Sequence, residues 1–159
     1  MSVPALMGIL LQDAFWSALA AIGFAVLFNV PPRYLPAGAG CAALGHALRT
    51  LMMQFGVPVE FATLFAATIM GFVTLLLANR LQAPAMLFAI PGIIPMIPGS
   101  FAYRAMIGLV SMVSAPPDQA NELLIQASSN FIRTGLILGA LGMGLAAPLL
   151  LFQREKPVV

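Results

Sequence analysis

The sequence predicts an all-α, polytopic membrane protein with about five transmembrane helices, the fourth broken by a Pro/Gly-rich loop. Three observations support this fold class. Hydrophobic residues make up 61% of the 159 positions, charged residues make up only 8%, and the apolar runs are long and continuous. A soluble domain carries roughly 25% charged residues, so this chain has too little polar surface to cover itself in water. Barrel strands would instead alternate apolar and polar residues over roughly 10 positions.

Five hydrophobic segments define the expected spans. They cover about residues 13–30, 37–55, 60–79, 84–113 and 120–152. We take the whole chain, 1–159, as a single integral membrane domain. A helix needs roughly 20 residues to cross a bilayer core of about 30 Å, and the first three segments fit that length. The fourth is longer because prolines interrupt it, and the polar first third of the fifth, 120–132, is expected to project into the headgroups or beyond them.

Positive residues predict the orientation in the membrane. A five-crossing arrangement puts four of them on one side: Arg33, Arg80, Arg154 and Lys156. The flanks on the other side contain no Lys or Arg, so the positive-inside rule makes the C-terminus cytoplasmic and the N-terminus external. Four acids then fall at the outer ends of the spans: Asp13, Glu60, Asp118 and Glu122. A re-entrant fourth segment would leave four crossings, and this alternative stays open. No cleaved signal peptide is expected, because the first eleven residues contain no Lys or Arg.

The sharpest local feature is the stretch 90–100, which reads IPGIIPMIPGS. Pro91, Pro95, Pro98 and Gly99 are expected to form a broken-helix loop, since three prolines in eight residues cannot sit in one regular helix. Unwound backbone at membrane depth survives only where protein buries it or water reaches it. Transporter sites are often built at such discontinuous helices, although a kink that serves packing alone is the alternative.

The half-helix after this break carries the first candidate substrate-binding residues. Ser100 is expected to cap it, which would leave its N-terminal N–H groups facing an anion. Tyr103 and Arg104 follow in its first turns.

His46 and Arg49 are the second candidate group. They are three residues apart and therefore share one face of the second segment. Arg49 lies about 18 Å from the cytoplasmic start of that segment at 1.5 Å per residue, with no acid beside it in the sequence. A charge without a partner at membrane depth is by default a functional-site hypothesis, so we predict that both residues bind an anionic substrate. The alternative is that Arg49 extends along its stem to the headgroups.

Other function classes are not expected from the residues present. No Cys, Asp or Glu completes a metal set with His46, so neither a metal nor another cofactor is predicted. An enzyme is not predicted, because no intramembrane acid pair, usable Ser–His–Asp set or phosphate-binding glycine loop is found. Nucleic acid is not expected without a basic patch that contains aromatic residues. Cys41, the single cysteine, is expected to be a small packing residue.

Three motifs resemble the threonine/serine exporter family: FNVPPR at 28–33, GHALR at 45–49 and IPMIPGSFAYRAMI at 94–107. The similarity extends over nearly the whole chain and includes Asn130 and Phe131. It is closest to the small subunit of split, two-protein succinate exporters of bacteria. The resemblance implies export of a small carboxylate across the bacterial inner membrane, together with a larger membrane subunit that carries the other half of the path.

Two function classes remain open at this point. The chain is either a transport subunit with its own carboxylate site or an accessory subunit that stabilises a partner holding the whole site. A succinate-type dicarboxylate suits two Arg residues, whereas threonine or serine needs an acceptor for its ammonium group. Because no acid is expected inside the membrane, that acceptor would come from the partner. The coupling ion, the stoichiometry and a higher oligomer are also left open.

Overall fold

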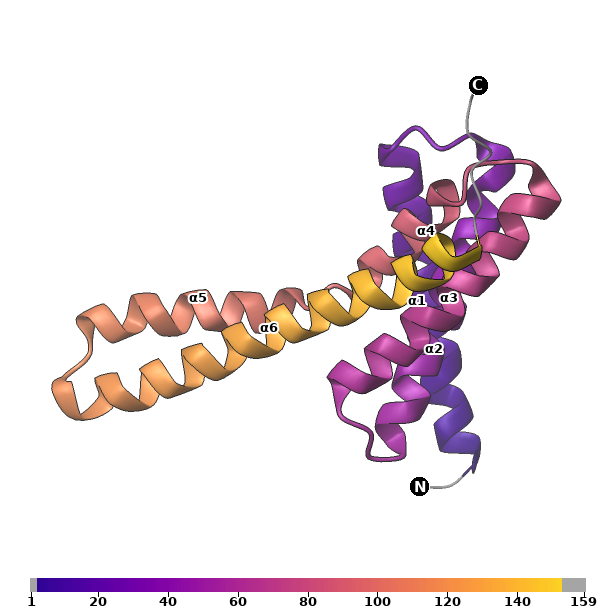
Figure 1. Cartoon of the computed structure of the whole chain (residues 1–159). Helices are drawn as coiled ribbons and strands as arrows, with labels where there is room; N and C mark the ends of the chain where they lie inside the picture. The colour runs from indigo at the N-terminus through magenta and orange to yellow at the C-terminus, as the bar shows by residue number, and fades with distance from the viewer. Residues whose placement is uncertain (1–2, 153–159) are drawn as a thin grey trace. The chain divides into compact units, whose positions relative to one another are not determined.

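The computed structural model describes residues 3–152, and within them it leaves out the side chain of Pro117. Over this range the protein is all-α, as predicted (Figure 1). Its elements in chain order are α1 (Val3–Leu27), η1 (Pro32–Tyr34), α2 (Leu35–Gln54), α3 (Val59–Leu81), α4 (Met86–Ile93), η2 (Ile94–Met96), α5 (Gly99–Ser114) and α6 (Pro117–Phe152), where η denotes a short 3₁₀ helix. Arg154 and Lys156, on which the predicted cytoplasmic tail depends, lie outside the described residues.

Three of these helices are long and apolar enough to cross a membrane, namely α1, α3 and α6. A fourth span results if α4 with η2 and the following α5 are counted as one interrupted crossing. The prediction of a polytopic helical protein with a broken helix is confirmed, with three to four candidate spans in the described range. The helix α2 is not among these candidate spans, because His46, Arg49 and several glycines lower the mean hydropathy of its 20 residues.

The first helix begins earlier than the sequence pattern suggested. It starts at Val3 rather than near Asp13, because the residues before Asp13 are also apolar and continue the helix without a break. Asp13 therefore lies in the interior of α1 and not at its outer end. This correction matters for the site described below.

The chain divides into two compact units. One contains the described residues up to Met96 together with those from Ala140 onward, and the other is Ile97–Gly139. In the first unit α1 packs extensively along α2, and α2 also contacts α3, α4 and η2 (Figure 1). Small residues line these contacts, including Ala21 and Ala25 on α1 and Ala42 and Gly45 on α2. Small side chains let helix backbones approach closely, which is how membrane helices commonly associate.

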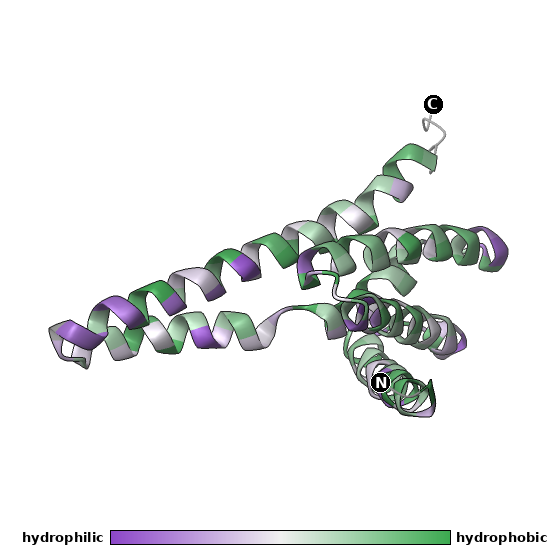
Figure 2. Ribbon diagram, turned by 90° about the horizontal axis from the view of Figure 1, so that it is seen from below, coloured by the Kyte–Doolittle hydropathy of each residue, from purple (hydrophilic) through white to green (hydrophobic). Residues whose placement is uncertain are grey.

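In the second unit, α5 and the first part of α6 run side by side and are joined by a short turn (Figure 1). A Cβ added at Gly108 would lie 2.9 Å from the Cβ of Ala127, so the two helices are in close contact there. Hydrophilic positions gather in the first part of α6, within the predicted polar third (Figure 2). Many large apolar side chains of this unit are exposed, among them Met106, Val110 and Phe131.

The proline-rich stretch is less unwound than predicted. Pro91 lies inside α4, Pro95 lies inside η2, and the helical structure is interrupted only at Ile97 and Pro98. Pro98 is the N-cap residue of α5 and Gly99 is its first residue. The prolines shorten the helix and tighten it into a 3₁₀ turn, a common way for a helix to end.

A close contact between α3 and the last part of α6 gives a prediction about stability. A Cβ at Gly144 would lie 2.8 Å from the carbonyl oxygen of Leu64 and 2.8 Å from the Cβ of Ala67, whereas a Cβ at Gly142 would meet nothing within 4 Å. Overpacking of this kind costs about 1–3 kcal/mol. Gly144→Ala should therefore lower the thermal unfolding temperature in detergent, while Gly142→Ala, two positions away, should not. Equal unfolding temperatures for the two variants would contradict the close α3–α6 packing.

Candidate functional site

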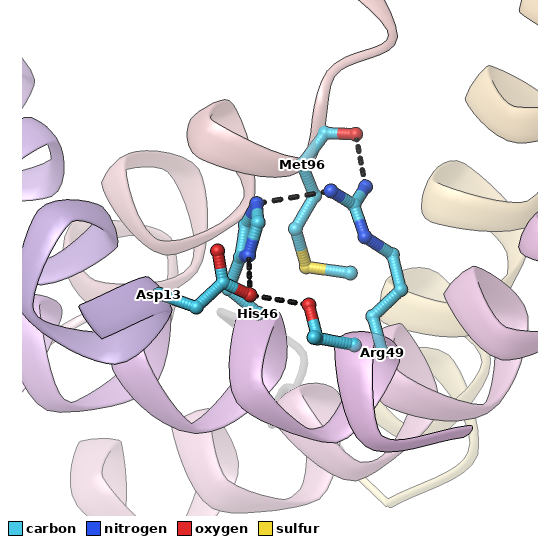
Figure 3. Close-up of polar contacts among 5 residues, drawn as sticks. Asp13, His46, Arg49 and Met96 are labelled. Carbon is cyan, nitrogen blue, oxygen red and sulfur yellow. Dashed lines mark hydrogen bonds and ion pairs between the residues drawn. The ribbon is translucent and has the colours of Figure 1, made fainter. Parts of the chain in front are cut away.

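The helices α1 and α2 and the turn η2 bring Asp13, His46, Arg49 and Met96 together in one chain of hydrogen bonds (Figure 3). The Nδ1 atom of His46 lies 2.8 Å from Oδ2 of Asp13, and its Nε2 atom lies 2.9 Å from Nη2 of Arg49. The Nη1 atom of Arg49 donates to the main-chain oxygen of Met96 over 2.8 Å. Two of the predicted site residues, His46 and Arg49, are thus in direct contact.

Helical spacing explains how α2 builds this cluster. Residues 46, 49 and 50 are separated by three and four positions, so they lie on one face of the helix. That face packs against α1, and the hydroxyl of Thr50 donates to the same carboxylate oxygen of Asp13 that His46 contacts. Because α1 and α2 both contact η2, the free carbonyl of Met96 lies within reach of Arg49.

The hydrogen-bond pattern determines the tautomer of His46. A guanidinium group can only donate, so Nε2 of His46 must accept the bond from Arg49. The ring proton of a neutral imidazole is then on Nδ1, from which it is donated to Asp13. His46 in this arrangement is neutral and connects an ionised carboxylate to an ionised guanidinium.

The expectation that Arg49 has no acidic counterpart was wrong. Asp13 balances its charge through His46, and the three side chains together carry no net charge. Sequence reasoning missed Asp13 because it lies 36 positions before Arg49 and was placed at a helix end. The apolar residues before Asp13 were the signal that it lies within a helix.

Arg49 is held inside the first unit and does not extend toward a helix end. Two of its nitrogens are bonded to Met96 and His46, while its Nε atom is buried and has no hydrogen-bond partner among the described residues. The Nε–H and one N–H of Nη2 point along the same edge of the guanidinium, which is the edge that can bind both oxygens of a carboxylate. Half of that edge is unused, and the other half contacts His46.

The broken helix contributes to this cluster through its backbone. Met96 is the last residue of η2, directly before the interruption. Carbonyl groups at a helix end have no partner within the helix, and that of Met96 accepts its hydrogen bond from Arg49 instead. Arg49 therefore contacts the main chain directly before the interruption, and this contact lies within the first unit.

The other predicted substrate-binding residues belong to the second unit, namely Ser100, Tyr103 and Arg104. Tyr103 and Arg104 line a groove of about 540 Å³ between α5 and α6, together with the polar residues Ser111, Gln126, Ser129 and Asn130. Ser100 is exposed, is absent from that lining and makes no capping hydrogen bond. The expectation that it caps α5 was wrong, because Pro98 occupies the N-cap and places Ser100 inside the helix.

Arg133 and Cys41 have simpler environments. Arg133 is exposed, with its guanidinium carbon 5.9 Å from the centre of the Phe101 ring. Cys41 is buried and free, as expected for a packing residue. Within residues 3–152 no group of three or more His, Cys, Asp or Glu side chains could hold a metal ion.

Comparison with known proteins places these observations in a family. The family described as "Threonine/Serine exporter, ThrE" matches residues 13–151. A protein of Haemophilus influenzae described as an uncharacterized protein is 47% identical over 150 residues, which are 94% of this chain and 50% of that relative. The chain thus spans about half the length of this curated relative. No solved structure matches the chain. With the family pattern covering nearly all of the described helices, the chain belongs to the threonine/serine exporter family.

Proposed function

We propose that the chain is a subunit of a membrane exporter that moves a small carboxylate out of the cell, with a succinate-type dicarboxylate as its substrate. The observation that carries this proposal is the position of Arg49. Its guanidinium is hydrogen-bonded to the main chain at the end of η2, and its Nε donor has no partner among the described residues. Arg is suited to carboxylates because its planar fork makes two parallel charge-assisted hydrogen bonds.

Binding requires a change in only one existing contact. A carboxylate that bonds to Nε and Nη2 of Arg49 would replace the acceptor atom Nε2 of His46, while the bond from Nη1 to Met96 could remain. His46 is thereby the residue that the substrate displaces. Ser100, Tyr103 and Arg104 remain proposed substrate contacts on the second unit, where Tyr103 and Arg104 line the polar groove.

A threonine or serine substrate is the second candidate, and Asp13 favours it. An amino acid needs an acceptor for its ammonium group, and the carboxylate of Asp13 lies in the same cluster as Arg49. Metabolite analysis of the medium of cells that produce or lack the exporter distinguishes the two substrates. Loss of succinate release on deletion supports the dicarboxylate, and loss of threonine or serine release with succinate unchanged supports the amino acid.

We further propose a larger membrane subunit of the same family as an obligate partner. The Haemophilus influenzae relative is about twice as long as the matched region, and many transporters pair two related halves around a site at the middle of the membrane. Deletion of either subunit should abolish export, and the purified chain alone should not move succinate into liposomes. Succinate transport by the chain alone would contradict the need for a partner. An accessory role, in which the partner holds the whole site, is the remaining alternative.

The proposed location is the bacterial inner membrane, with the N-terminus outside and the C-terminus in the cytoplasm. In a five-crossing arrangement Arg33 and Arg80 lie in loops on the same side of the membrane as the C-terminus. The positive-inside rule makes that side cytoplasmic. A reporter fused after Val159 should behave as cytoplasmic. With Cys41 replaced by Ala, an Asp118→Cys variant should react with a membrane-impermeant thiol reagent in intact spheroplasts. A periplasmic C-terminus would overturn this topology.

Substitutions of Arg49 test whether the site lies in this chain. Arg49→Lys keeps the charge but loses the fork, so export should fall by about 10- to 100-fold, as expected for the loss of one charge-assisted hydrogen bond of about 1.5–3 kcal/mol. Arg49→Ala should be worse, and membrane levels should stay normal in both. Arg133→Ala is the control, because Arg133 is exposed and belongs to the second unit. Wild-type export by both Arg49 variants would favour the accessory role.

A further inference from the structure

His46 lies between a carboxylate and a guanidinium, and each of its ring nitrogens is used. Its Nδ1 atom is 2.8 Å from Asp13 and its Nε2 atom is 2.9 Å from Arg49. The side chain of His46 is 16% exposed and that of Asp13 is 26% exposed, so both are mostly but not completely buried. Histidine is the side chain type that ordinarily gains or loses a proton near neutral pH.

Protonation of His46 is incompatible with its bond to Arg49. A protonated imidazole carries hydrogen on both nitrogens and cannot accept, so a proton on Nε2 would point at the N–H of Arg49. The bond between Nε2 and Nη2 must then break, whereas the bond from Nδ1 to Asp13 becomes a hydrogen-bonded ion pair and is strengthened. The edge of Arg49 formed by Nε and Nη2 is left free for another acceptor.

The charges around His46 within the first unit are few. Asp13 is the only charged residue of α1, and Arg49 is the only charged residue of α2. The helix α3 carries Glu60 in its first turn and Arg80 in its last turn, and η1 carries Arg33, while α4 and η2 have no charged residue. Of these charged side chains, Asp13 and Arg49 are the two that are hydrogen-bonded to His46.

We propose that His46 binds one proton together with the carboxylate, so that the exporter releases its substrate and a proton on the same side. This rests on the proposed function, because the carboxylate must bind to Arg49. In the unloaded cluster the charges of Asp13 and Arg49 cancel. One proton on His46 gives the cluster a charge of +1, and one bound carboxylate group returns it to zero. Linkage is reciprocal, so each ligand strengthens the binding of the other.

Inside-out membrane vesicles from cells that produce the exporter test this coupling. Succinate uptake into such vesicles corresponds to export, and a pH-sensitive dye in the lumen reports protons that accompany it. The apparent KM for succinate should fall by up to about tenfold per unit decrease of pH in the histidine range, because one proton is bound with the substrate. Addition of succinate should also acidify the lumen.

His46→Gln is the matched variant. Its amide can accept from Arg49 and donate to Asp13, but it cannot take a proton. Uptake by this variant should lose the pH dependence of KM and the luminal acidification, apart from the small part that arises from titration of succinate itself and is common to both proteins. Asp13→Asn is the second variant. Without the carboxylate the cluster already carries a charge of +1, so its KM should also lose the pH dependence.

The outcomes separate this inference from the proposed function. Arg49-dependent succinate uptake with the same pH dependence in the wild type and in both variants would overturn the proton site but leave the carboxylate site intact. Absence of Arg49-dependent uptake in the wild type would overturn both. Loss of the pH dependence in either folded variant, with uptake retained, supports His46 as the proton site.

Discussion

The structure of the first unit depends on how one largely enclosed guanidinium group is hydrogen-bonded by its neighbours. An Arg residue at the centre of a transmembrane helix costs about 2.5–3.5 kcal/mol on insertion scales, and this cost falls when the charge is paired and hydrogen-bonded. Arg49 obtains both through His46, Asp13 and the Met96 carbonyl. These contacts involve α1, α2 and η2 at once, so the same interaction that satisfies the charge also holds the three elements in register.

The polar cluster depends on small residues at the interface between α1 and α2. Ala21, Ala25, Ala42 and Gly45 let the two helices approach closely. Without that approach, short side chains such as Asp13 and Thr50 could not meet across the interface. The apolar packing and the polar network are therefore two parts of one arrangement. A bulky residue at the interface would disturb the network even though it touches no charged group.

The fold class and the presence of a broken helix could be predicted from the sequence, because composition and proline spacing are local properties. His46 and Arg49 could also be paired in advance, since helical spacing alone brings them together. Asp13 could not, because its position depends on which face of α1 packs on α2, and that is a property of the tertiary structure. The predicted break in the helix was also longer than the observed one, for a related reason. Prolines were taken to unwind the backbone, whereas Pro91 and Pro95 are accommodated inside α4 and η2, and only Pro98 stands at the interruption.

The bond from Arg49 to Met96 joins a side chain to the main chain. Any residue at position 96 with the same backbone conformation would present the same oxygen, so the hydrogen bond itself places no requirement on the side chain there. Pairs of this kind leave no correlated substitutions between homologues, because only one of the two positions is constrained in identity. Contact inference from covariation would therefore detect the link between α2 and the broken helix through neighbouring side chains, and would not detect the hydrogen bond itself.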